Sequence, residues 1–278
     1  MSTAVWTSRI DADSIANKAL DAAAKFWLFV AVIGQWAFLY YIVVFYGPST
    51  FTGNFQAWTR NRFLFKGYVA GDTAGNLAFA AHALLAAVIA FGGAIQLVPL
   101  IRTRFPAVHR WNGRVFLSVA LGLSVSGLYM EWIRQAQSNL YGAIAISFNA
   151  VFIITFAILA WRTAMAREMR AHRKWAMRTY LVSNAQWFFR VGLFAWLIVN
   201  RGPVGLGKNF DGPFILFLDY GCYLVPLATL ELYLRAKESA DPSKRWAVAL
   251  AIVALTLLLG IGIFGFNMFT WKNLLAQR

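Results

Sequence analysis

The sequence predicts an all-α membrane protein, a polytopic bundle of seven transmembrane helices. Three observations predict this class. Of the 278 residues, 60% are hydrophobic and 13% are charged, whereas about a quarter of the residues in a soluble domain are charged. The mean hydropathy is +0.57. The apolar residues also gather into runs of about 20, the length that crosses a hydrocarbon core of about 30 Å.

Seven apolar runs qualify as spans, and each is bounded by loops that contain Pro, Gly or charged residues. The expected spans are residues 25–46, 76–101, 113–133, 139–162, 176–199, 212–234 and 246–268. No soluble domain interrupts them. Residues 25–278 are therefore expected to form a single transmembrane domain.

The segment that precedes the first span, residues 1–24, is mixed in character. Ile10, Ile15, Ala19 and Ala23 recur at roughly helical intervals, with Asp and Lys between them. Such a pattern is typical of an amphipathic helix that lies on the inner membrane surface. The alternative is a partly frayed extension of the first span.

The basic residues of the loops predict the orientation. Seventeen Lys and Arg fall on the side that holds the N-terminus, and eight fall on the other side. By the positive-inside rule the N-terminus is cytoplasmic and the C-terminus lies outside, as in a multi-pass protein of a bacterial inner membrane. The net charge of +15 lies in these short loops. It therefore indicates contact with anionic lipids, and not with nucleic acid.

Two similar phrases each follow one span and open the next. HRWNGRVF covers residues 109–116 and HRKWAMRTY covers residues 172–180, in a chain with only three histidines. Both fall on the predicted cytoplasmic side. The pair indicates an internal repeat of a two-helix hairpin, residues 76–133 and 139–199.

The repeated phrases admit two interpretations. In the functional one, His109 and His172 converge as ligands of a metal or of haem iron, or as donors to an anionic group, and Arg114 and Arg178 supply fixed, forked donors. In the structural one, the phrases are positive-inside anchors, and each imidazole caps a neighbouring helix or pairs with a lipid phosphate.

These phrases, with GGAIQLVPLIRTRF before the first and FFRVG after the second, resemble a family of bacterial membrane proteins, domain of unknown function 2306. That family carries an HRxxGR phrase and, one hairpin later, HRxWMxR. The matching residues are Gln96, Pro99, Arg102, Pro106, His109, Arg110, Gly113, Arg114, His172, Arg173, Trp175 and Arg178. The resemblance covers roughly half of the chain.

The resemblance has further implications and one departure. His82 and Arg190 fall where the family tends to carry such residues, and Ala176 stands where the family has Met. A ligand role for that Met is therefore not transferable to this chain. The family is loosely similar to cytochrome b561-like proteins, which implies haem b as a cofactor.

A second group of polar residues falls inside the spans. At 1.5 Å per residue, His82 and Asp219 lie about 9–10 Å from the outer end of their helices, and Asn149 and Arg190 about 15 Å. Gln186 stands one turn from Arg190. A charge at this depth needs a partner, and Asp219 is the expected one. The group is either a structural ion pair or a polar pocket, open to the outside, that binds a small polar or anionic ligand.

Haem has two candidate placements. On the cytoplasmic side, His109 and His172 would be the axial ligands of a haem b, with propionates on the arginines. On the outer side His82 would be a ligand, with Met130 as a second. Three histidines allow one such haem and exclude two bis-histidine haems.

A pair of glycines, Gly92 and Gly93, lies on the face of the second span that carries His82 and Gln96. Small residues let a neighbouring helix or a flat ring approach the backbone closely. The glycines therefore indicate either close helix packing or a slot for the haem.

Three functions follow from these patterns. The first is a haem-containing redox protein that exchanges electrons with a quinone or a small acceptor. The second is a non-enzymatic binder or transporter of a small or lipid-like anionic ligand. The third is an accessory subunit of a membrane complex. The sequence has no HExxH, P-loop or GxSxG motif, so it gives no motif for zinc, nucleotide or serine hydrolysis.

Overall fold

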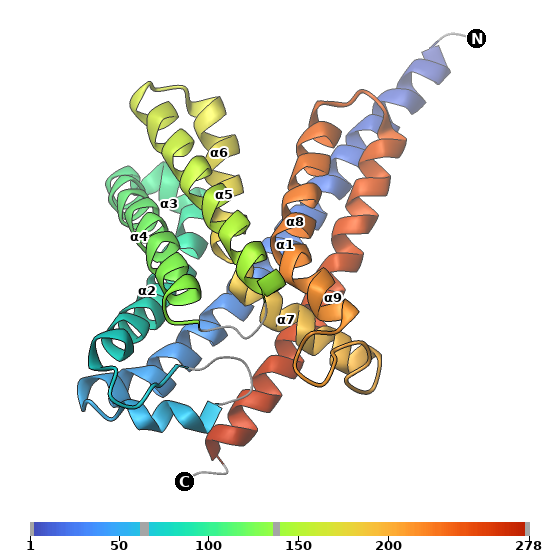
Figure 1. Ribbon diagram of the computed structural model, residues 1–278. Coiled ribbons are helices and arrows are strands. Elements are labelled where there is room, and N and C mark those ends of the chain that lie inside the picture. The colour runs from blue at the N-terminus through green and yellow to red at the C-terminus, as the bar shows by residue number, and fades with distance from the viewer. Residues whose placement is uncertain (1–2, 62–66, 136–139, 276–278) are drawn as a thin grey trace.

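The computed structural model describes residues 3–61, 67–135 and 140–275, and within these ranges its regular structure is helical. Figure 1 shows the bundle. The elements in chain order are α1 (Thr3–Phe51), the 3-10 helix η1 (Phe55–Asn61), α2 (Thr73–Leu97), α3 (Pro99–Arg104), α4 (Pro106–Trp132), α5 (Leu140–Met165), α6 (Met169–Ser183), α7 (Ala185–Val199), α8 (Pro213–Glu238) and α9 (Pro242–Leu275).

The predicted class is confirmed. Six of these helices are long and apolar enough to cross a membrane, and α6 with α7 makes a seventh, bent span. Figure 1 places the two ends of the chain on opposite sides of the bundle. We call these the N-terminal side, where α1, α4, α6 and α9 begin, and the C-terminal side. The assignment of the N-terminal side to the cytoplasm stays a prediction.

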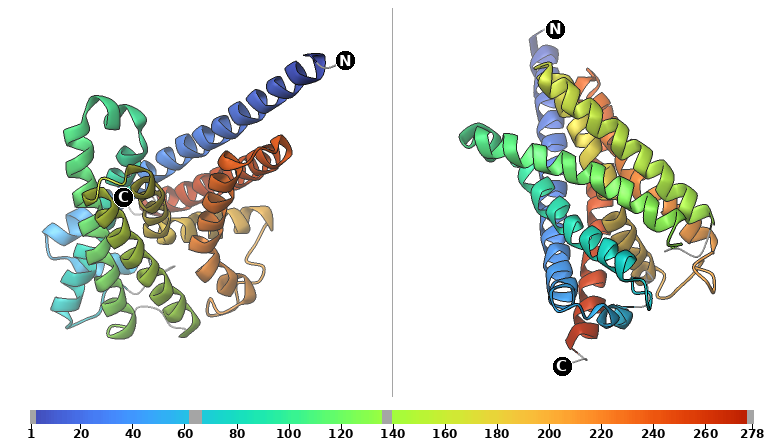
Figure 2. Two further views of the ribbon diagram at one scale, coloured as in Figure 1. Left: turned by 90° about the horizontal axis from the view of Figure 1, so that it is seen from above. Right: turned by 60° about the vertical axis from the view of Figure 1, so that its left-hand side comes forward.

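Helix α1 continues through the segment before the first span, for which a surface helix and an extension of the span were the two alternatives. Its 49 residues measure about 73 Å, and Figure 2 shows it as one long helix. Leu20 and Ala23 are buried against the end of α8 and the start of α9, whereas Ile15 is 54% exposed. An amphipathic helix at the membrane surface would turn Ile15 toward lipid, so this role of the segment stays a prediction.

The span that was predicted over residues 176–199 is bent. Helices α6 and α7 meet at an angle of 55°. Asn184 lies at the bend with φ −99° and ψ 12°, and its Nδ2 donates to the carbonyl oxygen of Tyr180 at 2.7 Å. In a regular helix that carbonyl would accept the backbone N–H of Asn184. The side chain thus replaces the hydrogen bond that the bend removes.

The core lies around α7, which α1, α8 and α9 surround. Val191 and Leu193 of α7 are almost completely buried. Gly34 of α1 lies against the Trp187 side chain of α7, and Gly262 of α9 lies against Val191. A Cβ at either glycine would overlap its neighbour, so both glycines are needed for this close approach.

Candidate functional site

Helices α2 and α4 are joined by two side-chain amides. Gln96 of α2 donates from Nε2 to the carbonyl oxygen of His109 at 2.8 Å, and Asn112 of α4 donates from Nδ2 to the carbonyl oxygen of Gly92 at 2.8 Å. A Cβ on Gly92 would lie 2.9 Å from Asn112 Oδ1, and one on Gly113 would lie 2.9 Å from Gln96 Nε2. The motif residues Gln96 and Gly113 therefore have a structural role, which fixes the start of α4.

The two histidines of the repeated phrases occupy the same helical position. His109 is the fourth residue after the N-cap Phe105 of α4, and His172 is the fourth after the N-cap Glu168 of α6. Each donates its backbone N–H to the carbonyl of its cap residue, at 3.1 and 2.9 Å respectively. Both helices begin on the N-terminal side of the bundle (Figure 1), and the two imidazoles interact electrostatically.

The rings of these histidines differ in their partners. His172 Nδ1 lies 2.8 Å from the carbonyl oxygen of Ala160 in α5. Because a carbonyl only accepts, this nitrogen carries the hydrogen, which leaves Nε2 as the lone-pair nitrogen of the neutral ring. His109 Nδ1 is buried and has no hydrogen-bond partner among the described residues. Arg102 and Arg110 act electrostatically on His109, so its surroundings are cationic.

The second arginine of each repeated phrase lies over the tryptophan of the same phrase. Arg114 Cζ is 4.9 Å from the ring centroid of Trp111, and Arg178 Cζ is 4.6 Å from that of Trp175. Arg178 also holds both carboxylate oxygens of Glu231 in α8, at 2.7 and 2.9 Å. The Arg178 guanidinium, which was predicted to bind an anionic group, is thus already bound to Glu231.

The glycines of α2 do not border a slot for a flat ring. Asn112 fills the space at Gly92, and the Tyr180 and Phe116 rings fill the space at Gly93, where a Cβ would lie 2.9 Å from Tyr180 Cε2 and 3.0 Å from Phe116 Cε2. Of the two interpretations of this pair, close helix packing is therefore correct, and a haem slot at these glycines is wrong.

Deeper in the membrane, His82 joins α2 to α4. Its Nδ1 lies 2.7 Å from Ser126 Oγ, and its ring lies beside Gly127, where a Cβ would be 3.7 Å from His82 Cε1. Met130 is buried one turn after Ser126. Arg190 acts electrostatically on His82, which brings two of the predicted pocket residues into one region.

Arg190 lies between α7 and α1. Its Nη1 donates to the carbonyl oxygen of Gln186 at 2.6 Å, and its Cζ lies 5.5 Å from the ring centroid of Phe38. Tyr41 and Tyr46 of α1 also interact with it electrostatically. The surroundings of Arg190 are thus rich in aromatic rings that face its charge.

Asp219 belongs to a different group. It is 9% exposed and interacts electrostatically with Glu131 of α4, which is 6% exposed. Asn149 of α5 has a buried Oδ1 without a hydrogen-bond partner among the described residues. The structure therefore gives Arg190 and Asp219 different neighbours, and their ion pair stays a prediction.

Sequence reasoning missed an ion pair at the C-terminal side. Arg134, which was counted only as a loop charge, donates from Nε to Asp72 Oδ2 and from Nη2 to Asn76 Oδ1, each at 3.0 Å. Asp72 also accepts the backbone N–H of Gly75 at 2.9 Å as the N-cap of α2. These bonds tie the start of α2 to the end of α4, 62 residues later, and this separation explains why no local pattern revealed them.

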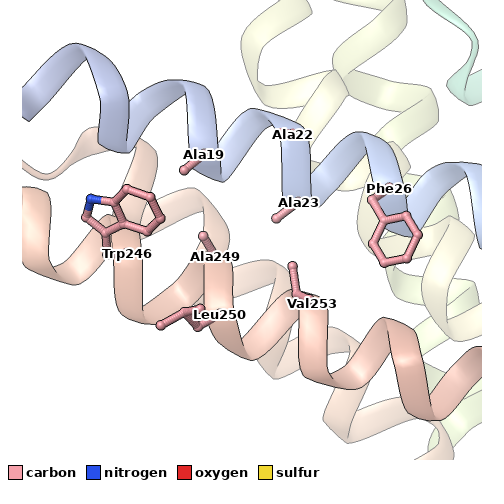
Figure 3. A pocket seen from close by; sticks show the side chains of 8 residues that line it. All are labelled: Ala19, Ala22, Ala23, Phe26, Trp246, Ala249, Leu250 and Val253. Carbon is pink, nitrogen blue, oxygen red and sulfur yellow. The ribbon is translucent and has the colours of Figure 1, made fainter.

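A hollow lies between α1 and α9 near the N-terminal side. Figure 3 shows that it is lined by alanines of α1 and by apolar side chains of both helices, with Phe26 and Trp246 toward its two ends. The indole of Trp246 supplies the only side-chain nitrogen drawn there. The hollow therefore suits an apolar chain, and it offers few groups for chemistry.

Residues 79–205 match a family described as Predicted membrane protein (DUF2306). The matched region runs from α2 to the loop after α7, and it contains all three histidines and Arg190. No curated protein and no solved structure matched the chain. With six apolar helices and a bent seventh span, the protein is an integral membrane protein.

Proposed function

We propose that this integral membrane protein is a redox protein that holds a haem b between His109 and His172 and exchanges electrons with a quinone or a small acceptor. One observation carries the proposal: the two histidines occupy equivalent positions at the start of α4 and α6, on the same side of the bundle. Haem iron bound in this way would accept and release one electron.

The donor set fits such a ligand pair. The hydrogen bond from His172 Nδ1 to Ala160 leaves Nε2 as the ligand atom and fixes the ring, as outer-shell carbonyls do for metal-bound histidines. His109 contributes a buried nitrogen that no described residue satisfies. We place the group between the two helix starts, because the spaces at Gly92 and Gly93 are filled.

The surrounding charges fit the carboxylates that haem b carries. Arg102 and Arg110 act on His109, and Arg114 rests on Trp111. Guanidiniums are suited to paired carboxylate oxygens. Arg178 is the exception, because Glu231 already neutralises it. By the charges of the loops, this side of the bundle faces the cytoplasm of a bacterial cell.

The test is the dithionite-reduced minus air-oxidised absorption spectrum of protein purified in detergent from haem-supplemented cells. We expect α and Soret bands in the wild type, their loss in His109→Ala and His172→Ala, and their retention in His82→Ala as the matched control. A folded wild-type protein with a flat spectrum would overturn the proposal.

A second candidate is a binder of a small anionic ligand at Arg190. It is supported by a guanidinium inside the bundle that lies over Phe38 and near His82. We expect ligand-induced thermal stabilisation that is lost in Arg190→Leu and kept in Arg114→Leu, in a panel of anionic lipids and small carboxylates. No shift with any member of the panel would remove this candidate.

A further inference from the structure

The bend of the fifth span lies beside the most completely buried polar side chain of α1. Gln35 is 0% exposed, and neither its Nε2 nor its Oε1 has a hydrogen-bond partner among the described residues. A buried amide without partners costs about 1–3 kcal/mol per unmade bond, so such a group needs an explanation.

Two further polar atoms at the bend are also buried without a hydrogen-bond partner among the described residues. Tyr180 is 3% exposed, and its hydroxyl is buried without a hydrogen-bond partner in the described part of the chain. Ser183 Oγ, one turn later at the end of α6, is likewise buried and unpaired. The Tyr180 hydroxyl and the Gln35 amide lie near hydrogen-bonding distance of each other, but their geometry is not that of a direct hydrogen bond.

The neighbours of these side chains hold them in place. The Tyr180 ring packs against Gly93 and makes an edge contact with Trp27, with the ring centroids 6.4 Å apart. Gly34, next to Gln35, lies against Trp187 of α7. Helix α1 thus crosses the fifth span at its bend, with Tyr180 before the crossing and Trp187 after it.

We propose that Gln35, Tyr180 and Ser183 form an internal binding site for ordered water at this bend. The cluster contains an amide and two hydroxyls, which both donate and accept, and it contains no charged group. Water satisfies such a set, because a buried water typically makes about three hydrogen bonds to otherwise unpaired polar groups. Irregular backbone at membrane depth is also tolerated where it is buried in protein or lines a hydrated space.

The water would bridge α1 to the end of α6. In this way it would supply hydrogen bonds at the bend and hold the two arms of the span at their angle, in addition to the bond from Asn184 to Tyr180. The site is separate from the histidines at the start of α4 and α6, and it does not depend on a haem.

The direct test is water-edited solid-state NMR of the isotope-labelled wild-type protein in lipid vesicles. We expect fast transfer of magnetisation from water to the Gln35 side-chain amide. The matched control is Asn76, which is 3% exposed and donates from Nδ2 to the Val69 carbonyl oxygen. Transfer to Gln35 no faster than to Asn76 would overturn the proposal.

Thermal unfolding of two variants gives an independent readout. If water bridges the cluster, Tyr180→Phe and Gln35→Met each remove one of its partners, and each lowers the Tm. The Tm of the double variant then falls by less than the sum of the two single decreases. If the site is dry, each substitution removes an unsatisfied group and raises the Tm, which would contradict the proposal.

Discussion

Gln96 and Asn112 cross between α2 and α4 in opposite directions, and each donates its side-chain amide to a backbone carbonyl of the other helix. Each of these carbonyls also accepts the backbone N–H four residues later in its own helix. It therefore accepts two hydrogen bonds, one for each of its lone pairs. Each amide also lies over a glycine, Asn112 over Gly92 and Gln96 over Gly113. The exchange therefore requires both amides and both glycines together.

Substitution of Gly92 by alanine should destabilise the protein. The new Cβ would lie 2.9 Å from Asn112 Oδ1, which forces the amide away from the Gly92 carbonyl. Overpacking of this kind costs about 1–3 kcal/mol. We expect a lower Tm for Gly92→Ala in detergent, measured by circular dichroism.

The matched control is Gly122→Ala in α4, where a Cβ would meet nothing within 4 Å. Alanine favours a helix by about 0.5–1 kcal/mol relative to glycine, so this variant should keep or raise the Tm. In the double variant Gly92→Ala, Asn112→Ala the clash disappears, and the two losses should not add. Additive losses would show that the side chains do not interact as described.

The ion pair of Arg178 with Glu231 should stabilise the contact between α6 and α8. Both side chains are mostly covered, with 17% and 34% of their surface exposed, and the pair is held by two hydrogen bonds. We expect Glu231→Gln to lower the free energy of unfolding by about 1.5–3 kcal/mol. The measurement is equilibrium unfolding in mixed micelles.

Arg178→Lys is the informative companion, because lysine keeps the charge and loses the fork. Its free energy of unfolding should lie between those of the wild type and of Arg178→Gln. The pair Lys174–Glu238 serves as an exposed reference, with 37% and 68% of the side chains exposed, and Glu238→Gln should lower the free energy of unfolding much less than Glu231→Gln does, because water screens an exposed pair. Equal effects of Glu231→Gln and Glu238→Gln would contradict the predicted contribution of the first pair.

Acid should weaken the contact between the start of α2 and the end of α4. The backbone N–H of Gly75, and after it the Arg134 guanidinium, holds the pKa of Asp72 below its ordinary value. A carboxylate with a lowered folded pKa contributes stability above the unfolded pKa, about 3.9. That contribution is lost as the pH falls through the lower, folded value.

We therefore expect the Tm of the wild type to fall below about pH 4, in part through Asp72. In Asp72→Asn the side chain still serves as an N-cap, but its charge is absent. The difference in Tm between this variant and the wild type should be largest at neutral pH and shrink with acid. A difference that is constant from neutral to acid pH would exclude the charge as its cause.

Asn184 should be required for the bend of the fifth span. In Asn184→Leu the side-chain bond to the Tyr180 carbonyl is lost, and leucine favours a continuous helix. Straightening two arms of 15 residues each from their angle of 55° would lengthen the span by about 5 Å. Spin labels at the exposed residues Met169 and Val199 report this distance by double electron–electron resonance. Asn184→Gln, which keeps a side-chain amide donor, is the control, and an unchanged distance in the leucine variant would show that tertiary packing alone sets the bend.

The sequence predicted the spans because hydropathy and length follow directly from the bilayer, and the family match covers the repeated phrases. It did not predict the bend, because Ser183, Asn184 and Ala185 include neither Pro nor Gly, the usual signals of a break. The partners of Arg178 and Arg134 lie 53 and 62 residues away. Such pairs depend on which helix faces meet, and a single sequence does not record that.

The residues of the candidate site were also only partly predictable from the sequence. The repeat of His109 and His172 was visible as a pattern, and the structure gives both residues the same place in their helices. The polar cluster of Gln35 and Tyr180 was not visible, because Gln35 stands alone within an apolar run and no local pattern links it to Tyr180. Only the crossing of α1 over the bend brings the two together.

The pairing of α1 with α9 has a consequence for biosynthesis. Of the helix pairs in the described chain, this one has the most extensive contact, and it joins two helices that lie far apart in the sequence, so that α9 is synthesised long after α1. Lys237 and Arg245, which pair with Asp21 and Asp13 of α1, also emerge late. Until α9 has been synthesised, the buried face of α1 has no α9 to cover it, so the nascent protein depends on lipid, the insertion machinery or a chaperone to shield that face.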